Sequence, residues 1–206
     1  MMGVKVKICG ITRPEDAVNA CQSGVDAIGL VFYKPSPRNV SIEQAREIVQ
    51  VLPPFVSVVA LFVDADSSEI YSVLQNVEID LIQFHGSESA EFCESFNKRY
   101  IKVIHMQEAV DLGASISQYP SSCGILLDTF QKELPGGTGR SFDWHLVPEY
   151  PGKPLIIAGG LTPSNVGDAI KIVRPYAVDV SGGVELSKGI KDAGKIADFI
   201  NQVHRC

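Results

Sequence analysis

The chain lacks a long uncharged segment and an excess of positive charge. No stretch without a charged residue is longer than residues 48–63, which Pro53 and Pro54 interrupt and which is too short to cross a bilayer. The first ten residues hold no apolar core followed by a cleavage site, so secretion is not expected. The net charge of −6 disfavours a nucleic-acid-binding surface. We therefore expect no membrane and no nucleic-acid partner.

Paired cysteines are also lacking. The five cysteines stand at positions 9, 21, 93, 123 and 206, an odd number with no CxxC pair. This spacing argues against a disulfide framework and against a zinc site, and it favours a reducing compartment. We expect a cytoplasmic protein without a bound metal. The length of 206 residues and the ordinary composition suit one domain, which we expect to span residues 1–206.

Short runs rich in valine and isoleucine recur at intervals of 21 to 30 residues. They begin near Val4, Asp26, Val56, Ile79, Tyr100, Gly124, Pro154 and Ala177. Several are apolar at consecutive positions, which is typical of parallel strands covered on both faces by helices. A strand followed by a helix, repeated about eight times, leaves an open doubly wound sheet or a closed (β/α)8 barrel. Because no GxGxxG fingerprint follows the first run, an α/β fold with a single (β/α)8 TIM barrel is favoured.

Helix start signals stand between these runs. Thr12 and Thr162 each lie shortly before a proline, Ser41 with Gln44 forms a capping-box pattern, and Ser87 precedes acidic residues. Each pattern predicts a helix N-terminus. The longest irregular segment, residues 129–141, is expected to be a functional lid or binding loop, with a tolerated insertion as the alternative.

Side chains that can do chemistry stand where the predicted strands end, which is where barrel enzymes place their sites. Cys9 is either a buried structural cysteine or a catalytic thiol. Asp128 follows three apolar residues, and it either caps a turn or, when protonated, donates a proton. His85 is more typical of a hydrogen-bonded rim residue than of a proton carrier. Arg38 either faces solvent or binds a carboxylate through two parallel hydrogen bonds.

Two glycine pairs end the seventh and eighth predicted strands. They are Gly159 with Gly160, and Gly182 with Gly183 directly after Ser181. Glycine allows backbone N–H groups to approach an anion, and the last two loops of a barrel are a recurrent phosphate site. Tight turns use glycine equally often, so each pair alone is weak evidence. Together they predict a phosphate site.

A buried ion pair is predicted beneath Cys9. Lys7 lies two residues before Cys9 and shares its face of the first strand, while Asp179 shares the face of the eighth strand that presents Ser181. Closure of a barrel makes these strands neighbours. An ammonium inside a barrel needs a partner, so we expect Lys7 to pair with Asp179 and to favour the Cys9 thiolate. The alternative is a lysine that extends to solvent.

The motifs taken together resemble the phosphoribosylanthranilate isomerase family of tryptophan biosynthesis. They are KICGIT (7–12), GLVFY (29–33), SPR (36–38), QFHG (83–86), LLDT (126–129), GGTG with FDW (136–144), AGGL (158–161) and VSGGVE with KGIKD (180–192). The resemblance covers nearly the whole chain. It implies a (β/α)8 barrel with no metal and no organic cofactor. It also implies an Amadori rearrangement of N-(5-phosphoribosyl)anthranilate, a small phosphosugar that carries the anthranilate carboxylate.

The resemblance also implies roles for particular residues. Cys9 matches the general base, Asp128 the general acid and Arg38 the ligand of the anthranilate carboxylate, whereas His85 matches a site residue without an assigned role. The phosphate cradle would consist of Gly159, Gly160, Ser181, Gly182 and Gly183. The family pattern SSGVE reads SGGVE here. The backbone donors are kept, but a hydroxyl is lost at position 182, which leaves the phosphate affinity or the loop rigidity open.

Other readings of the sequence remain. A ribulose-phosphate epimerase would need metal-binding histidines at several strand ends, and only His85 is well placed. The histidine-pathway isomerase would need an acid where Cys9 stands. Indole-glycerol-phosphate synthase has a longer chain and a catalytic lysine set that is missing here. A barrel that binds a phosphosugar without turnover is the non-enzyme alternative, against which the presence of both Cys9 and Asp128 counts.

Overall fold

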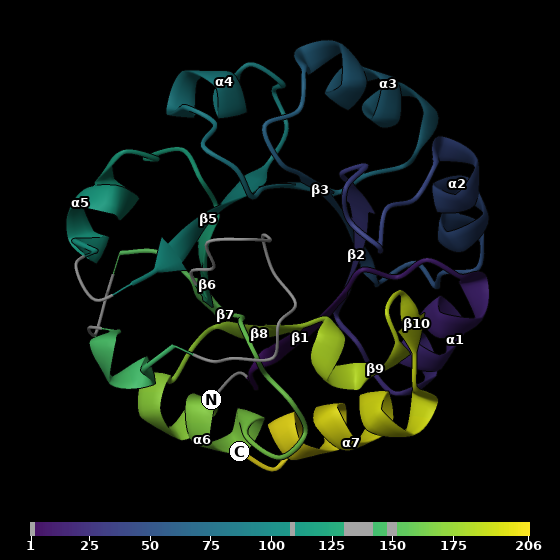
Figure 1. Cartoon of the computed structure of the whole chain (residues 1–206), viewed down its shortest axis with the longest axis vertical. Helices are drawn as coiled ribbons and strands as arrows, with labels where there is room; N and C mark the ends of the chain where they lie inside the picture. Colours follow the sequence, from purple (N-terminus) through teal and green to yellow (C-terminus); the bar gives the residue numbers. More distant parts are fainter. Residues whose placement is uncertain (1–2, 108–109, 130–141, 148–151) are drawn as a thin grey trace.

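A closed barrel of eight parallel strands forms the centre of the computed structural model, which describes residues 3–107, 110–129, 142–147 and 152–206 (Figure 1). The strands lie in sequence order, and β8 returns to pair with β1. They are β1 (Lys5–Cys9), β2 (Ala27–Phe32), β3 (Ser57–Phe62), β4 (Leu81–Phe84), β5 (Tyr100–Met106), β6 (Gly124–Thr129), β7 (Leu155–Ile157) and β8 (Ala177–Val180). Each begins within two residues of its predicted start, so the predicted barrel is confirmed. Most of the predicted lid, residues 130–141, lies outside the described residues.

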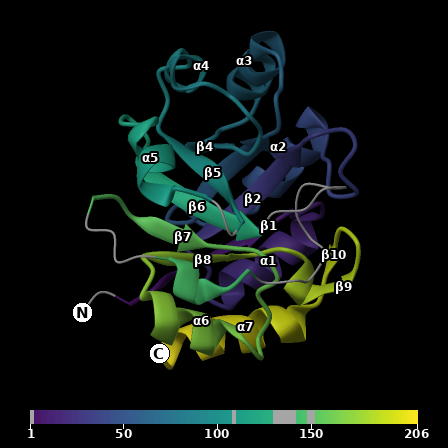
Figure 2. The same ribbon diagram turned by 60° about the vertical axis from the view of Figure 1, so that its left-hand side comes forward.

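Helices surround the barrel (Figures 1 and 2). They are α1 (Pro14–Gln22), α2 (Ile42–Gln50), α3 (Ser67–Asn76), α4 (Ala90–Glu94), α5 (Leu112–Ser117), α6 (Val166–Val173) and α7 (Ala193–His204). Two short 3-10 helices, η1 (Trp144–Leu146) and η2 (Gly182–Val184), and a small hairpin of β9 (Glu185–Ser187) and β10 (Ile190–Lys191) complete the described elements. Within the described ranges no helix has the length and apolar character that a membrane span requires.

One predicted helix start is confirmed and three are corrected. Ser41 caps α2 through the predicted capping box with Gln44. Thr12 does not cap α1, because its hydroxyl donates to the Gly189 carbonyl and Arg13 takes the N-cap position. Likewise, α6 begins after Asn165 and not at Thr162. The helix expected after Ser87 begins at Ala90, where the Ser89 hydroxyl accepts the amide of Phe92.

Apolar side chains pack on both faces of the barrel wall. The outer layer, between strands and helices, includes the fully buried Ile8, Ile28 and Ile125. The inner layer fills the barrel with Ile101, Val103, Leu126, Ile156, Ala158 and Ala177. Because successive residues of a strand point to opposite faces, Ile125 packs outside while Leu126 packs inside. This double burial explains why the strands read as continuous apolar runs.

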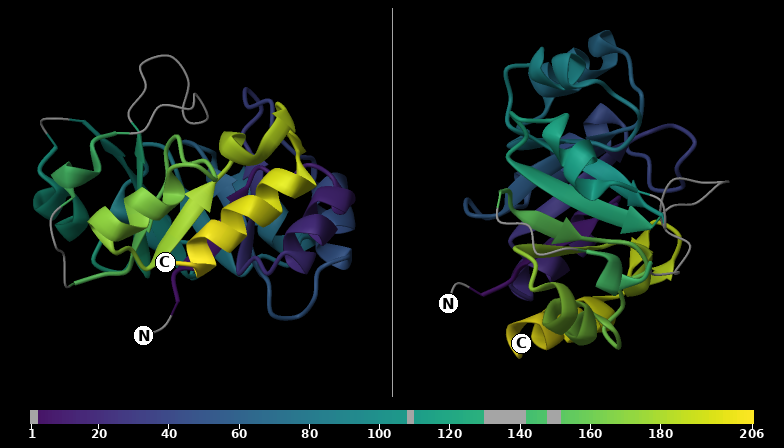
Figure 3. Two further views of the ribbon diagram at one scale, coloured as in Figure 1. Left: turned by 90° about the horizontal axis from the view of Figure 1, so that it is seen from below. Right: turned by 90° about the vertical axis from the view of Figure 1, so that its left-hand side faces the viewer.

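The carboxyl ends of the strands form one mouth of the barrel. The hairpin of β9 and β10 lies at this end, and the N-terminus lies at the opposite end (Figure 3). Loops that leave the strands at the mouth, such as those after β7 and β8, are the segments that carry the two glycine pairs. The fold therefore gathers the predicted site residues at one end.

A buried ion pair joins the first and last strands of the barrel. Lys7 and Asp179 are direct register partners between β1 and β8. The Lys7 Nζ lies 3.0 Å from Asp179 Oδ2, and the two side chains are 5% and 8% exposed. The predicted pair is therefore confirmed. It lies one layer below Cys9, because Lys7 precedes Cys9 by two residues on the same strand face.

Replacement of Asp179 by asparagine would leave the buried Lys7 ammonium without its counter-charge. We expect Asp179→Asn to lower the free energy of unfolding by about 3–5 kcal/mol, measured by urea denaturation. The matched control is Lys5→Met, which removes the 48%-exposed ammonium of the neighbouring Lys5–Asp26 pair and should cost less than about 1 kcal/mol. Equal losses in the two variants would contradict a special role for the buried pair.

Candidate active site

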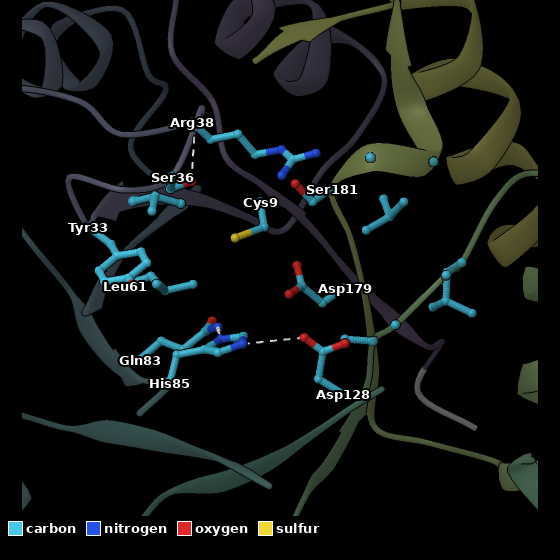
Figure 4. Close-up of a pocket in the computed structure, with 18 of the residues that line it drawn as sticks. Cys9, Tyr33, Ser36, Arg38, Leu61, Gln83, His85, Asp128, Asp179 and Ser181 are labelled. Carbon is cyan, nitrogen blue, oxygen red and sulfur yellow. Dashed lines mark hydrogen bonds and ion pairs between the residues drawn. The ribbon is translucent and has the colours of Figure 1, made fainter. Parts of the chain in front are cut away.

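A single pocket at the mouth of the barrel contains every residue that the sequence assigned to the site (Figure 4). It encloses about 760 Å3 of space, which includes part of the open solvent at its mouth. The predicted residues that line it are Cys9, Arg38, His85, Asp128, Gly159, Gly160, Ser181, Gly182 and Gly183. The pocket is also lined by Asp179, so the buried ion pair forms part of its floor.

Cys9 ends β1 and is buried against Val31 and Leu61. A Cβ atom at Gly29, its register partner on β2, would lie 2.7 Å from the Cys9 sulfur, so the glycine leaves room for the thiol. Burial raises the pKa of Cys9, and the opposing fields of Lys7 and Lys191 do not reverse the shift. Lys7 favours the thiolate and Asp179 opposes it, as expected, but burial outweighs both, so the thiol is the favoured form in the free protein.

Asp128, near the end of β6, lies next to His85. The Nε2 atom of His85 is 3.4 Å from Asp128 Oδ2, and Asp128 Oδ1 accepts the amide of Thr129 at 2.7 Å. Burial alone would raise the pKa of Asp128, but His85 and the Thr129 amide outweigh it and hold this pKa below its usual value. The protonated carboxyl expected from the sequence is therefore not the favoured form in the free protein.

Arg38 is buried, which excludes the alternative that it faces solvent. Its Nε and Nη2 atoms donate to Glu185 at 2.7 and 2.8 Å, and Lys191 Nζ contacts the same carboxylate at 3.0 Å. The Glu185 hydrogen bond raises the pKa of Arg38 and fixes its orientation. Figure 4 shows the guanidinium group extending into the pocket near Ser181. Because Glu185 occupies the Nε–Nη2 edge, the Nη1–Nη2 edge is left for a second carboxylate.

The first glycine pair stands in backbone conformations that other residues avoid. Gly159 and Gly160 have φ values of +79° and +66°, in the region that favours glycine. The Asn165 side chain fixes this turn by donating to the Gly160 carbonyl at 3.0 Å. A Cβ atom at Gly183 would collide with the carbonyl oxygen of Leu161, so the loops after β7 and β8 pack closely together.

These loops present hydrogen-bond donors to the pocket. Within the described part of the chain, the amides of Gly159, Gly160, Gly182 and Gly183 donate to no other residue. Backbone N–H groups away from bulk water need acceptors. The amides are therefore available to the oxygen atoms of a bound anion.

The sequence analysis missed His105, Glu185 and Lys191. His105 stands on β5 and its ring lies 5.2 Å from the ring of His85. The statement that only His85 is well placed for a metal is therefore wrong. The alternation of Ile101, Val103 and His105 could have revealed this inward-facing position. Burial, reinforced by His85, lowers the pKa of His105.

Glu185 and Lys191 belong to motifs that the resemblance had singled out without giving them a role. The contact of Arg38 with Glu185 joins residues 147 positions apart, and Lys191 binds the same carboxylate. No local sequence signal indicates such a pairing.

The fold and the pocket define the class of protein. A closed (β/α)8 barrel that brings a thiol, a carboxylate, an imidazole and free glycine amides to the carboxyl ends of its strands has the architecture of a barrel enzyme. Its reacting groups come from different strands, as is usual for this fold.

Comparisons with known proteins identify the family. A sequence profile of N-(5'phosphoribosyl)anthranilate (PRA) isomerase matches residues 6–202. A Pseudomonas paraeruginosa protein named N-(5'-phosphoribosyl)anthranilate isomerase is 57% identical over 98% of this chain and 96% of its own length. A protein of the same name from Nitrosococcus oceani is 55% identical over 98% of both chains.

Solved structures agree. The crystal structure of phosphoribosyl anthranilate isomerase from Thermotoga maritima matches with a TM-score of 0.90 and 42% identity, over 98% of this chain and 100% of that one. A phosphoribosyl anthranilate isomerase in complex with reduced 1-(o-carboxyphenylamino)-1-deoxyribulose 5-phosphate matches with a TM-score of 0.87 and 40% identity over the same shares. The chain belongs to the N-(5'-phosphoribosyl)anthranilate isomerase family, and it is an isomerase.

Proposed function

We propose that the chain converts N-(5-phosphoribosyl)anthranilate to 1-(2-carboxyphenylamino)-1-deoxyribulose 5-phosphate, the Amadori rearrangement of tryptophan biosynthesis. The observation that carries this proposal is the meeting of Cys9 and Asp128 in one pocket, between a carboxylate-binding arginine and the free glycine amides. The solved relative that binds the reduced product supports it. The substrate carries a carboxylate at one end and a phosphate at the other, which matches the two anion-binding ends of the pocket.

Asp128 and Cys9 act on neighbouring atoms of the sugar. Asp128 gives a proton to the furanose ring oxygen as the bond from that oxygen to C1 breaks, and the anthranilate nitrogen forms a C=N bond to C1. Cys9 then removes the proton from C2, and the electron pair forms a C1=C2 bond while it neutralises the iminium nitrogen. Return of a proton to C1 and loss of the C2 hydroxyl proton give the ketone. One group donates and one group accepts, as general acid–base catalysis requires.

The two catalytic groups together hold one proton in the free protein. The raised pKa of Cys9 and the lowered pKa of Asp128 keep that proton on sulfur, whereas the reaction needs it on the Asp128 carboxyl. The two forms have the same net charge and proton count, so their ratio does not depend on pH. The active form, with a Cys9 thiolate and an Asp128 carboxylic acid, is the less populated of the two.

Arg38 and the glycine loops bind the two ends of the substrate. The free edge of the Arg38 guanidinium accepts the anthranilate carboxylate in the bidentate geometry that arginine favours. The phosphate receives hydrogen bonds from the amides of Gly159, Gly160, Gly182 and Gly183, beside Ser181. His85 stays a site residue that contacts Asp128. The glycine at position 182 supplies an amide without the hydroxyl of the family pattern.

The remaining features of this proposal concern the protein as a whole. We assign residues 1–206 to one barrel domain that works in the cytosol without a metal or an organic cofactor. All five cysteines are free, which is typical of proteins from a reducing compartment.

Removal of either proton-transfer group tests the mechanism. Cys9→Ala and Asp128→Asn are each expected to lower kcat by at least ~100-fold, the scale of a positioned acid or base. Turnover is followed by the loss of anthranilate fluorescence with substrate generated in situ. Cys21→Ser and Asp168→Asn, which change the same residue types on α1 and α6, should keep wild-type kcat. Near-normal turnover in a folded Cys9 or Asp128 variant would contradict the assignment, and a wild-type protein without turnover would favour the non-catalytic alternative.

Arg38→Met tests whether the carboxylate and the phosphate of the substrate bind at separate ends of the pocket. Loss of a bidentate contact worth roughly 1.5–3 kcal/mol should raise KM by about 10- to 100-fold, with a smaller effect on kcat. Inorganic phosphate, used as a competitive inhibitor, should bind the variant and the wild type equally, because it occupies the glycine loops. Lys34→Met removes an exposed charge from the same loop and should leave KM unchanged. A loss of phosphate affinity in Arg38→Met as large as the rise in KM would contradict separate binding of the carboxylate and the phosphate.

The shared proton predicts an unusual pH dependence. Because the pKa of Asp128 lies below and that of Cys9 above the neutral range, the one-proton state dominates, and the active fraction stays constant as pH changes. We expect kcat to be flat between about pH 7 and 9. It should fall at higher pH, where Cys9 loses its proton, and at lower pH, where Asp128 gains a proton while Cys9 keeps its own. In Asp128→Asn the residual kcat should instead rise with pH as the thiolate forms. A wild-type rate that climbs through this range would count against the shared proton.

A further inference from the structure

Three potential metal ligands converge beside the pocket. His85 follows β4, His105 stands on β5 and Asp128 on β6, where His105 and Asp128 are register partners. All three side chains point into the barrel, because each continues the series of inward-facing positions of its strand. One ligand atom from each residue lies within 4.8 Å of the other two.

The hydrogen bond of His105 leaves one of its ring nitrogens free to bind a metal. Its Nε2 atom lies 3.2 Å from the carbonyl oxygen of His85. A carbonyl oxygen only accepts, so this contact places the His105 proton on Nε2 and leaves a lone pair on Nδ1. Metal-bound histidines usually donate their other N–H to a carbonyl or carboxylate in this way.

His85 has Gln83 as its partner in the opposite sense, because the Gln83 amide nitrogen only donates and so leaves the ring proton on Nε2, toward Asp128. The amide of Gln83 contacts His85 Nδ1 at 3.0 Å. Two buried atoms of this pair, Gln83 Oε1 and His85 Nε2, have no hydrogen-bond partner among the described residues. A half-turn of the carboxamide lets Oε1 accept the Nδ1 proton and leaves a lone pair on Nε2, which faces Asp128 at 3.4 Å.

We propose that His85, His105 and Asp128 form an inhibitory site for a divalent transition metal ion, with Zn²⁺ as the preferred occupant. Two imidazole nitrogens and one carboxylate oxygen form a known three-residue zinc set, and water or substrate takes the fourth position. Tetrahedral zinc needs its ligand atoms about 3.3 Å apart, so the cluster must contract modestly. When a metal ion is bound, His85 and Asp128 are its ligands and cannot contact the substrate. The ion therefore competes with substrate. The binding follows from the cluster alone, whereas the inhibition rests on the proposed role of Asp128.

Direct metal titration tests the site without any assay of turnover. Zn²⁺ binding is measured by calorimetry on the full chain, and Co²⁺ is used as a spectroscopic probe. We expect one Zn²⁺ per chain, an affinity lowered at least ~10-fold by His105→Ala, and no change in His204→Ala, which removes an exposed histidine. The Co²⁺ spectrum should lack a thiolate band. Unchanged Zn²⁺ affinity in His105→Ala, an equal loss in His204→Ala, or a thiolate band would overturn the site.

Kinetics then test the inhibition. Zn²⁺ should raise the apparent KM of the wild type and leave that of His105→Ala nearly unchanged, each compared with the same protein in the presence of a chelator. Zn²⁺ that binds at the site but leaves turnover unaffected would overturn the inhibitory role and count against Asp128 as the acid, although the metal site would stand. Inhibition that persists in His105→Ala would overturn the assignment to this cluster.

Discussion

The buried pair of Lys7 and Asp179 is the interaction on which the arrangement of the site depends. It joins the first and last strands in direct register, at the point where the sheet closes on itself. Cys9 lies one layer above Lys7 on β1, and Ser181 directly follows β8. The pair therefore sets how the thiol lies relative to the anion-binding loops. A slip of one residue between these strands would turn one of the two charged side chains out of the barrel.

The burial that stabilises the barrel also sets the protonation of its reacting groups. Desolvation raises the pKa of Cys9, and the field of Lys7 is weakened by the carboxylate of Asp179 beside it. On the other side of the pocket, His85 compensates the desolvation of Asp128 and keeps that carboxyl ionised. Because of these two shifts, neither the thiolate of Cys9 nor the carboxylic acid of Asp128 is the favoured form in the free protein. In the mechanism that we propose, the single proton moves from Cys9 to Asp128 before the reaction, which reconciles these shifts with acid–base chemistry.

Strands and inward-facing pairs could be predicted from the sequence because their signals are local. Apolar runs mark the strands, and the two-residue period placed Lys7 and Asp179 on inward faces. The predicted cap at Thr12 failed because a distant partner, the Gly189 carbonyl, accepts its hydroxyl. Contacts such as Arg38 with Glu185 depend on how remote loops meet, so no window of sequence contains them. His105 was missed because β5 continues beyond it to Met106, which hid it from a search of strand ends.

The cluster around Arg38 explains how a buried arginine could still bind a second carboxylate. Two cations, Arg38 and Lys191, share the single carboxylate of Glu185. Burial, together with the nearby Arg38, lowers the pKa of Lys191 despite its ion pair, as expected where positive charge is in excess by one. A second carboxylate at the free edge of Arg38 would balance that excess in a partly desolvated site, where charge pairs interact strongly. Glu185 thus orients the guanidinium, and Lys191 compensates the repulsion between the two carboxylates.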